Sequence, residues 1–279
     1  MNDLSGRTAI VTGASRGIGV YIAEELCRQG MRLALAARGQ PELEAIAAGL
    51  RQDGREIVVI PTDLASAASR ASLVEEALRT FGHVDVLVNN AAMEVTLPFH
   101  RISETEIDQT IQVSLTAPIS LMRLLVPHML ERRSGHIVNI GSLAGKSGPP
   151  FSGTYGATKA GLIAFTETFR SEYHGSGVSA SVICPGYVRE SGMYHRIAGE
   201  TGIRAPWFIG TSRPEAIARA VTRAISRDVP EIIVNPVPMR FMTAVSELSP
   251  GLGEWLTRRS GANTLWEQAA RSYERERSE

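Results

Sequence analysis

The sequence predicts an α/β protein: a doubly wound parallel sheet of about seven strands with helices on both faces. Short continuous apolar runs, typical of strands buried on both sides, alternate with helical segments from residue 8 to residue 236. A glycine-rich turn directly follows the first run, as in nucleotide-binding halves of doubly wound folds. Neither a linker nor an internal repeat interrupts the alternation, so we expect residues 1–279 to form a single domain.

Each apolar run predicts one strand, and local residues mark the helices between them. The predicted strands cover residues 8–11, 31–36, 57–60, 84–88, 136–140, 178–183 and 232–234. The first helix ends at Gly30, and the second begins at Pro41 and ends at Gly54. Ser103 and Glu106 form a capping-box pattern that opens one long helix. The later helices are predicted over residues 66–81, 103–132, 153–174 and 214–227.

Charge and composition argue against several classes of protein. Lys plus Arg equals Asp plus Glu, so the formal net charge is zero and nothing indicates a nucleic-acid partner. Cys27 and Cys184 fall in an expected helix and an expected strand, which favours buried thiols over a disulfide or a metal site. No apolar run approaches the ~20 residues of a membrane-spanning helix. The first strand leaves no room for a signal peptide, so we expect a cytoplasmic protein.

The turn after the first strand, residues 12–19, is a candidate phosphate-binding loop. Gly13, Gly17 and Gly19 would let the backbone approach a diphosphate at the positive N-terminus of the next helix. The alternative is a glycine turn without a ligand. Its position between the first strand and the first helix favours a dinucleotide.

Tyr155 and Lys159 are a candidate proton-transfer pair. They lie four residues apart in a predicted helix, so their side chains share one face. A nearby ammonium favours an ionised phenol, whose ordinary pKa is about 10, so we expect Lys159 to lower the pKa of Tyr155. An exposed helix face with no catalytic role has the same spacing, and the meaning of the pair depends on its surroundings.

The loop and the Tyr-x-x-x-Lys pair together resemble the short-chain dehydrogenase/reductase family over about residues 5–236. The same order of motifs includes Asp63 after the third strand, residues 89–92 after the fourth and residues 185–186 after the sixth. Ser142 lies 13 residues before Tyr155, which is the family's usual spacing. The resemblance implies a Rossmann-type fold and a nicotinamide cofactor.

The resemblance also implies the roles of individual residues. Tyr155 would be the acid or base, Ser142 would hydrogen-bond the substrate oxygen, and Lys159 would hold the nicotinamide ribose. Asp63 is similar to the residue that binds the adenine amino group, and Asn90 to one that lines the ribose; simple loop capping is an equal alternative for Asp63. With Tyr155 and Lys159, the implied cofactor-binding residues are Gly13, Ser15, Arg16, Gly17, Ile18, Gly19, Arg38, Asp63, Leu64, Asn90, Ala91, Pro185, Gly186 and Val188.

The choice of cofactor depends on the turn after the second strand. A carboxylate there would bind a ribose 2′-hydroxyl and repel a 2′-phosphate. This turn instead carries Arg38, and Arg16 lies in the glycine loop. Two guanidiniums suit a phosphate, so we expect NADP(H) rather than NAD(H). The alternative is that one or both arginines are merely solvated.

Two positions depart from the family pattern. Ser114 stands where the family usually has a catalytic asparagine. The resemblance implies that the main-chain carbonyl at this position holds a relay water. Pro118 has no N–H to donate to the Ser114 carbonyl, so we expect this carbonyl to be free for that water and the serine to slow the reaction without abolishing it. A helix kink without catalytic consequence is the alternative. Glu190 replaces a frequent threonine, and we expect it to point away from the diphosphate or to pair with Arg189.

Two segments lie outside the alternation of strands and helices. Residues 189–213 correspond to the family's substrate loop, and their side chains Met193, Tyr194, Trp207 and Phe208 favour a substrate with an apolar body or, equally, anchor the loop to the core. Residues 237–279 form a C-terminal extension. Its apolar residues recur at helical intervals over 239–256, which favours packing on the core or on another subunit over an interfacial membrane helix.

These features predict an NADP(H)-dependent oxidoreductase that interconverts a ketone and a secondary alcohol. A 3-oxoacyl thioester reductase with the same site is the first alternative. A catalytically idle nucleotide-binding sensor or scaffold is the second, favoured only by Ser114, Glu190 and Ala92, the last in place of a usual glycine. Members of the family usually pair through the two long helices, here residues 103–132 and 153–174, so we expect a homodimer or homotetramer.

Overall fold

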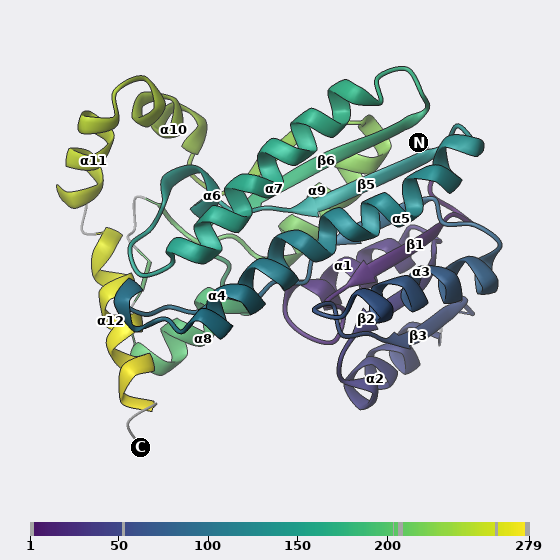
Figure 1. Cartoon of the computed structure of the whole chain (residues 1–279), viewed down its shortest axis with the longest axis horizontal. Helices are drawn as coiled ribbons and strands as arrows, with labels where there is room; N and C mark the ends of the chain where they lie inside the picture. Colours follow the sequence, from purple (N-terminus) through teal and green to yellow (C-terminus); the bar gives the residue numbers. More distant parts are fainter. Residues whose placement is uncertain (1–2, 52–53, 203, 206–208, 260–261, 277–279) are drawn as a thin grey trace.

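A seven-stranded parallel sheet forms the centre of the protein (Figure 1). The computed structural model describes residues 3–51, 54–202, 204–205, 209–259 and 262–276. The strands are β1 Thr8–Thr12, β2 Arg32–Ala37, β3 Ile57–Pro61, β4 Val86–Asn89, β5 Gly135–Ile140, β6 Val178–Pro185 and β7 Glu231–Val234. Their order is β3-β2-β1-β4-β5-β6-β7, which confirms the predicted doubly wound sheet. The strand order reverses between β1 and β4, and ligands of such sheets bind at the carboxyl ends beside this point.

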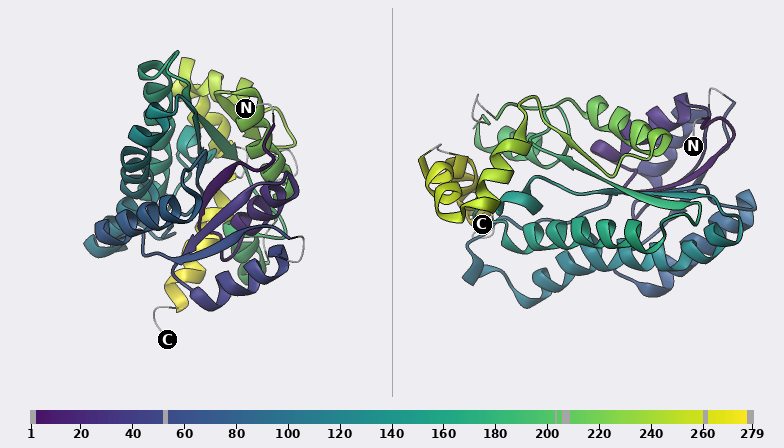
Figure 2. Two further views of the ribbon diagram at one scale, coloured as in Figure 1. Left: turned by 90° about the vertical axis from the view of Figure 1, so that its right-hand side faces the viewer. Right: turned by 90° about the horizontal axis from the view of Figure 1, so that it is seen from above.

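Helices cover both faces of the sheet, as Figure 2 shows. One face carries α1 Ile18–Arg28, α2 Gln40–Arg51 and α9 Pro214–Arg227, whose apolar residues form one core cluster with the strands. The other face carries α3 Ala67–Phe81, α5 Ala117–Glu131 and α7 Gly153–Glu172 around a second cluster. The two clusters account for the continuous apolar character of strands such as β1, which is buried along its whole length.

The long helix predicted over residues 103–132 begins as expected but is interrupted. Ser103 Oγ accepts the N–H of Glu106, and the Glu106 carboxylate accepts the N–H of Ser103, which confirms the capping box. An α-helical part, α4 Glu104–Ile111, passes through a π-helical turn, η2 Gln112–Thr116, into α5. The Ala117 N–H donates to the Gln112 carbonyl five residues back. Pro118 cannot donate to Ser114, so the wider turn falls where a regular bond is unavailable.

The two segments outside the alternation contain more helix than the sequence suggested. The substrate loop holds α8 Gly192–Thr201, and the C-terminal extension holds α10 Met239–Leu248, α11 Pro250–Arg259 and α12 Ala262–Glu276. The helical pattern of residues 239–256 is therefore divided, because Pro250 starts a new helix. The last of these helices, α12, packs against α8.

Packing explains only part of the apolar pattern of α10 and α11. The two helices contact each other, and α10 also contacts the short helix α6 Ala144–Ser147. Phe241 and Leu248 nevertheless remain 77% and 87% exposed, and Trp255 is 52% exposed. The expectation that this segment packs on the core therefore holds for part of its surface only.

One continuous helical stretch, Glu104–Glu131, is long and apolar enough to cross a membrane by the criteria of length and composition. The most apolar window of this stretch has a mean hydropathy of 1.3, and 44% of it is buried inside the protein. Its apolar side chains include Leu121, Leu125 and Met129, which lie in the core against the sheet. In this protein, the apolar side chains of this stretch therefore pack against β5, β6 and α3.

Candidate active site

The glycine loop lies at the carboxyl end of β1, next to the end of β4. A Cβ atom on Gly13 would lie 2.9 Å from the Ala91 Cα, and one on Gly19 would lie 2.1 Å from the Gly13 carbonyl oxygen. Gly17 caps α1 with a φ of 66°, in the left-handed region that favours glycine. The loop thus brings backbone close to backbone and leaves the first N–H groups of α1 facing the carboxyl edge, a geometry that fits a diphosphate.

The loop is held to β4 by Asn90. Its Nδ2 donates to the carbonyls of Thr12 and Gly13 at 3.0 and 3.2 Å, and its N–H donates to Thr12 Oγ1 at 3.0 Å. At the end of β6, the Gly186 N–H donates to the Val234 carbonyl at 3.1 Å. The predicted cofactor residues on β1, β4 and β6 therefore share one edge of the sheet.

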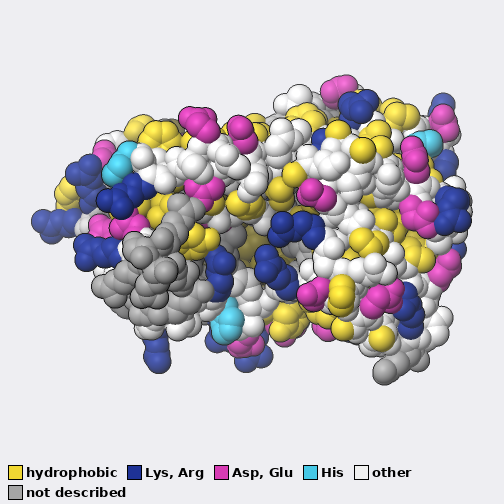
Figure 3. Space-filling model, turned by 60° about the horizontal axis from the view of Figure 1, so that its bottom comes forward, with side chains coloured by type: hydrophobic (Ala, Val, Ile, Leu, Met, Phe, Trp, Pro, Cys, Tyr) yellow, Lys and Arg dark blue, Asp and Glu magenta, His cyan; other side chains and the backbone are white. Residues whose placement is uncertain are grey.

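The two arginines predicted to bind a 2′-phosphate are both exposed, Arg16 in the loop and Arg38 after β2. Figure 3 shows Lys and Arg side chains bordering a hollow on one face of the molecule, an arrangement that suits an anionic ligand. Asp63 Oδ1 accepts the N–H of Ala65 at 3.0 Å, so this carboxylate caps its own loop. The contact of Asp63 with adenine stays a prediction.

Ser142, Tyr155 and Lys159 come together at the end of β5. Ser142 acts on the Tyr155 phenol and lowers its pKa, and the Lys159 Nζ lies 5.5 Å from the centre of the Tyr155 ring. Lys159 is only 1% exposed, and its Nζ donates to the Ile140 carbonyl at 2.7 Å. The shared helix face expected from the spacing is confirmed. The arrangement offers a hydroxyl pair and a buried cation to one reacting oxygen.

The pKa of Tyr155 moves in the direction opposite to our expectation. Burial raises it above its ordinary value, the nearby Glu94 carboxylate raises it further, and the Ser142 side chain opposes both. Burial also lowers the pKa of Lys159 to about 8, against the opposing effects of Cys184 and Glu94. Since burial raises the pKa of the Cys184 thiol to about 12, this thiol is neutral at pH 7. Glu94 is therefore the anion that acts on Lys159.

Glu94 is a site residue that the sequence reasoning missed. Its side chain is 8% exposed, its Oε1 accepts the Ser152 hydroxyl, and its Oε2 is buried without a hydrogen-bond partner among the described residues. Burial raises the pKa of Glu94 to about 7, although Ser152, Arg196 and Lys159 each lower it. A signal was available, because a lone carboxylate stands among apolar residues just after the fourth strand.

Ser114 is fully buried and bonds the segment that carries Glu94. Its Oγ accepts the Met93 N–H at 2.9 Å and donates to the Met93 carbonyl at 3.1 Å. A serine therefore holds both backbone groups of the residue before Glu94 from the π-helical turn. Whether the Ser114 carbonyl holds a relay water stays a prediction.

An aromatic wall combines Tyr187, just before the substrate loop, with Tyr194 in that loop and Trp266 on the C-terminal helix. The rings of Tyr187 and Tyr194 are 5.0 Å apart, and the Trp266 Nε1 on α12 donates to the Tyr187 hydroxyl at 3.2 Å. Trp207 and Phe208, which the sequence places in this loop, lie outside the described residues, and so does the side chain of Met193. The sequence reasoning also missed the part that α12 plays here.

Glu190 pairs with its neighbour, as expected. The Arg189 Nε lies 3.3 Å from Glu190 Oε1, and the Glu190 side chain is 54% exposed. Its φ of 66° places a non-glycine residue in the left-handed region. The carboxylate thus has a cationic partner in the turn that leads into α8.

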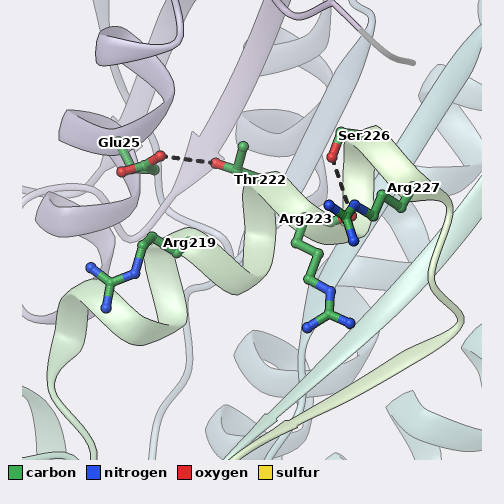
Figure 4. A pocket seen from close by; sticks show the side chains of 6 residues that line it. All are labelled: Glu25, Arg219, Thr222, Arg223, Ser226 and Arg227. Atoms are coloured by element: carbon green, nitrogen blue, oxygen red, sulfur yellow. Dashed lines mark hydrogen bonds between the residues drawn. The ribbon is translucent and has the colours of Figure 1, made fainter.

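A pocket of about 430 Å³ lies elsewhere, between α1 and α9 (Figure 4). Its lining residues are Glu25, Arg219, Thr222, Arg223, Ser226 and Arg227. Glu25 accepts hydrogen bonds from Arg28, from Gln29 at 3.0 Å and from Thr222 at 3.4 Å. Both helices run back from the carboxyl edge of the sheet, so this pocket lies toward the opposite edge from Tyr155.

The fold and this edge define a Rossmann-type nucleotide-binding protein, and comparisons identify its family. The short chain dehydrogenase family matches residues 7–201. Ketoacyl reductase HetN from Nostoc sp. is 41% identical, over 90% of this chain and 88% of HetN. The chain belongs to the short-chain dehydrogenase/reductase family.

Two solved structures are similar over most of the chain. A metagenomic short-chain oxidoreductase in complex with NADP has a TM-score of 0.71 and 33% identity, covering 84% of this chain and 99% of its own. A short-chain dehydrogenase/reductase from Burkholderia phymatum in complex with NAD has a TM-score of 0.80 and 26% identity, covering 90% and 96%. Both nicotinamide cofactors therefore occur among its structural relatives.

Replacing Ser114 tests its bonds to Met93. Ser114→Ala leaves the part-buried N–H and carbonyl of Met93 without this partner, and should lower the free energy of unfolding by about 1 kcal/mol in urea titrations. Ser114→Asn can donate and accept the same two bonds, and its turnover should equal or exceed that of the parent. An alanine variant as stable as the parent, or an asparagine variant with a large loss of turnover, would contradict this account.

The pH dependence of stability tests the burial of Glu94. Its folded-state pKa is raised from 4.5 to about 7, so the stability linked to this proton is complete below pH 4.5 and is lost as pH rises through 7. The neutral variant Glu94→Gln escapes this loss. Its melting temperature minus that of the parent should increase from pH 5 to pH 8, while the exposed control Glu56→Gln should show no such trend. A constant difference for Glu94→Gln would refute the shift.

Proposed function

We propose that this protein interconverts a ketone and a secondary alcohol with NADP(H), using Tyr155 as the acid or base. The observation that carries the proposal is the cluster at the end of β5. There Ser142 acts on the Tyr155 phenol and lowers its pKa, and the buried Lys159 Nζ lies 5.5 Å from the centre of the Tyr155 ring. A small-molecule substrate suits this edge, because the aromatic wall of Tyr187, Tyr194 and Trp266 lies beside it.

Each residue of the cluster has a role in this reaction. A bound nicotinamide supplies or accepts the hydride. As a carbonyl carbon is reduced, negative charge develops on its oxygen, and the hydroxyls of Ser142 and Tyr155 are placed to stabilise it. Tyr155 then gives its proton to that oxygen, and in the reverse direction takes it back. The Lys159 cation stabilises the phenolate that this transfer leaves.

The cofactor would lie along the glycine loop. Gly13 and Gly19 allow the close backbone approach that a diphosphate needs, and the first turn of α1 supplies N–H donors. Arg16 and Arg38 are exposed, and the turn between β2 and α2 carries no acidic residue, which supports NADP(H) over NAD(H). The NADP in one structural relative agrees with this preference, and the NAD in the other makes the experiment necessary.

A 3-oxoacyl thioester is a second candidate for the substrate. It is favoured by the similarity to HetN, whose name describes a ketoacyl reductase. The reacting group is again a ketone, so the roles of Ser142, Tyr155 and Lys159 are unchanged. Comparing simple ketones with a 3-oxoacyl thioester separates the two candidates, because only the substrate body differs.

Turnover tests the proposed reaction. The parent should oxidise NADPH in the presence of ketones, and Tyr155→Phe should lower kcat by 10²-fold or more, because it removes the proton donor while leaving the ring in place. The phenylalanine variant should bind NADPH about as tightly as the parent does, as measured by the fluorescence of the bound NADPH. Binding without turnover in the parent would favour the idle nucleotide-binding alternative.

Cofactor preference tests the role of Arg38. The parent should bind NADPH at least tenfold more tightly than NADH, and Arg38→Asp should reverse this order, since its carboxylate repels a 2′-phosphate and accepts a 2′-hydroxyl. Arg51→Asp, which changes an exposed arginine on α2, serves as the control and should leave the ratio unchanged. NADH binding equal to or tighter than NADPH binding in the parent would contradict the preference.

A further inference from the structure

Glu94 presents an acceptor that nothing in the described protein satisfies. Its side chain is more than nine-tenths buried, and its two oxygens have different surroundings. Oε1 accepts the Ser152 hydroxyl, whereas Oε2 is buried without a partner among the described residues. An unpaired carboxylate oxygen in the interior costs free energy, because it has lost water and gained nothing in return. A group that donates a hydrogen bond to Oε2 would offset this cost.

The protein fixes Glu94 from three directions. Ser114 holds the N–H and the carbonyl of Met93, the preceding residue. Ser152 holds Oε1, and the Leu97 N–H donates to the Phe151 carbonyl at 3.1 Å, which joins the two segments. The Glu94 carboxylate is therefore held through the backbone of the preceding residue and through its own Oε1. A recognition group requires this preorganisation.

Glu94 also lies close to the reacting groups. Its charge raises the pKa values of Tyr155 and Lys159, and the cations that act on it in turn are Arg196 on α8 and Lys159 on α7. The Glu94 charge also raises the pKa of Tyr187, in the aromatic wall. Ser152 immediately precedes α7 and stands three residues before Tyr155. An atom bound at Oε2 would therefore belong to the part of the substrate next to its carbonyl.

We propose that Glu94 determines substrate specificity by accepting a hydrogen bond from a donor on the substrate, a hydroxyl or an ammonium group next to the reacting carbonyl. The inference rests on the proposed function, because it places the substrate between Tyr155 and Glu94. Substrates with a donor at this position are preferred, and those with an oxygen that cannot donate are disfavoured. The apolar body of the substrate would contact the aromatic wall.

Three aryl ketones test the proposal: α-hydroxyacetophenone, α-aminoacetophenone and α-methoxyacetophenone, of which only the last has no donor. The parent should have a kcat/KM about 10- to 100-fold higher for the hydroxy or the amino ketone than for the methoxy ketone, as expected for one charge-assisted hydrogen bond. Glu94→Leu should abolish this preference. Glu94→Gln, with its carbonyl on Ser152 and its amide NH₂ in place of Oε2, should act on the hydroxy and methoxy ketones alike, because either oxygen can accept the amide N–H, and should disfavour the ammonium form of the amino ketone.

Ser152→Ala is the matched control, because it removes the partner of Oε1 and keeps the carboxylate. It should retain the preference for donor substrates even if it is less stable. A parent without the preference, or a Glu94→Leu variant that keeps it, overturns the proposal. A purely structural role would change the rates for all three ketones by the same factor, which also overturns it.

A binding measurement separates this inference from the proposed function. Thermal shifts of Tyr155→Phe with NADPH should be larger with the hydroxy ketone than with the methoxy ketone, and Glu94→Leu in that background should equalise them. If the parent turns over no ketone but Tyr155→Phe shows this difference in thermal shift between the two ketones, the proposed function fails and recognition by Glu94 stands. If the shifts with both ketones are equal, the recognition fails whatever the turnover.

Discussion

The burial of the Lys159 ammonium is the constraint on which the candidate site depends. The side chain is 1% exposed, and its Nζ bonds the carbonyl at the end of β5. Close packing holds it there: a Cβ on Gly145 of α6 would lie 2.7 Å from the Ala160 N. Because α7 is held so closely, Tyr155, one turn earlier on the same face, has a fixed position relative to Ser142. A buried cation also requires nearby electron-rich groups, and the Ile140 carbonyl and the Glu94 carboxylate supply them.

Glu94 connects parts of the site that the chain supplies separately. Ser114 belongs to the π-helical turn, Glu94 to the loop after β4, and Ser152 to the start of α7. The bonds from Ser114 to Met93 and from Ser152 to Glu94 join these three elements. Ser114 thus fills a structural role at the place where the family usually has asparagine. The departure from the family pattern is compatible with an ordered site, which weakens the argument for an idle protein.

The sequence predicted the sheet, the glycine loop and the Ser142, Tyr155 and Lys159 cluster, because each depends on local patterns or on motif spacing. It did not predict the surroundings of these residues. The pKa of Tyr155 is raised because burial and Glu94 act on it, and burial is a property of the folded chain rather than of a four-residue spacing. The role of α12 was missed for a similar reason: its polar sequence hides Trp266, whose contact with Tyr187 is set by tertiary packing alone.

The opposition between Glu94 and Tyr155 has a consequence for catalysis. An ionised carboxylate raises the pKa of the phenol and so disfavours the phenolate that forms when Tyr155 gives up its proton. A protonated Glu94 removes this opposition, and with a pKa of about 7 both forms are present at neutral pH. In the proposed contact, a substrate hydroxyl that donates to Oε2 stabilises the carboxylate and so keeps Glu94 ionised at neutral pH. The contact therefore favours substrate binding but retains the charge that opposes ionisation of Tyr155, and the Lys159 cation has to stabilise the phenolate against that charge.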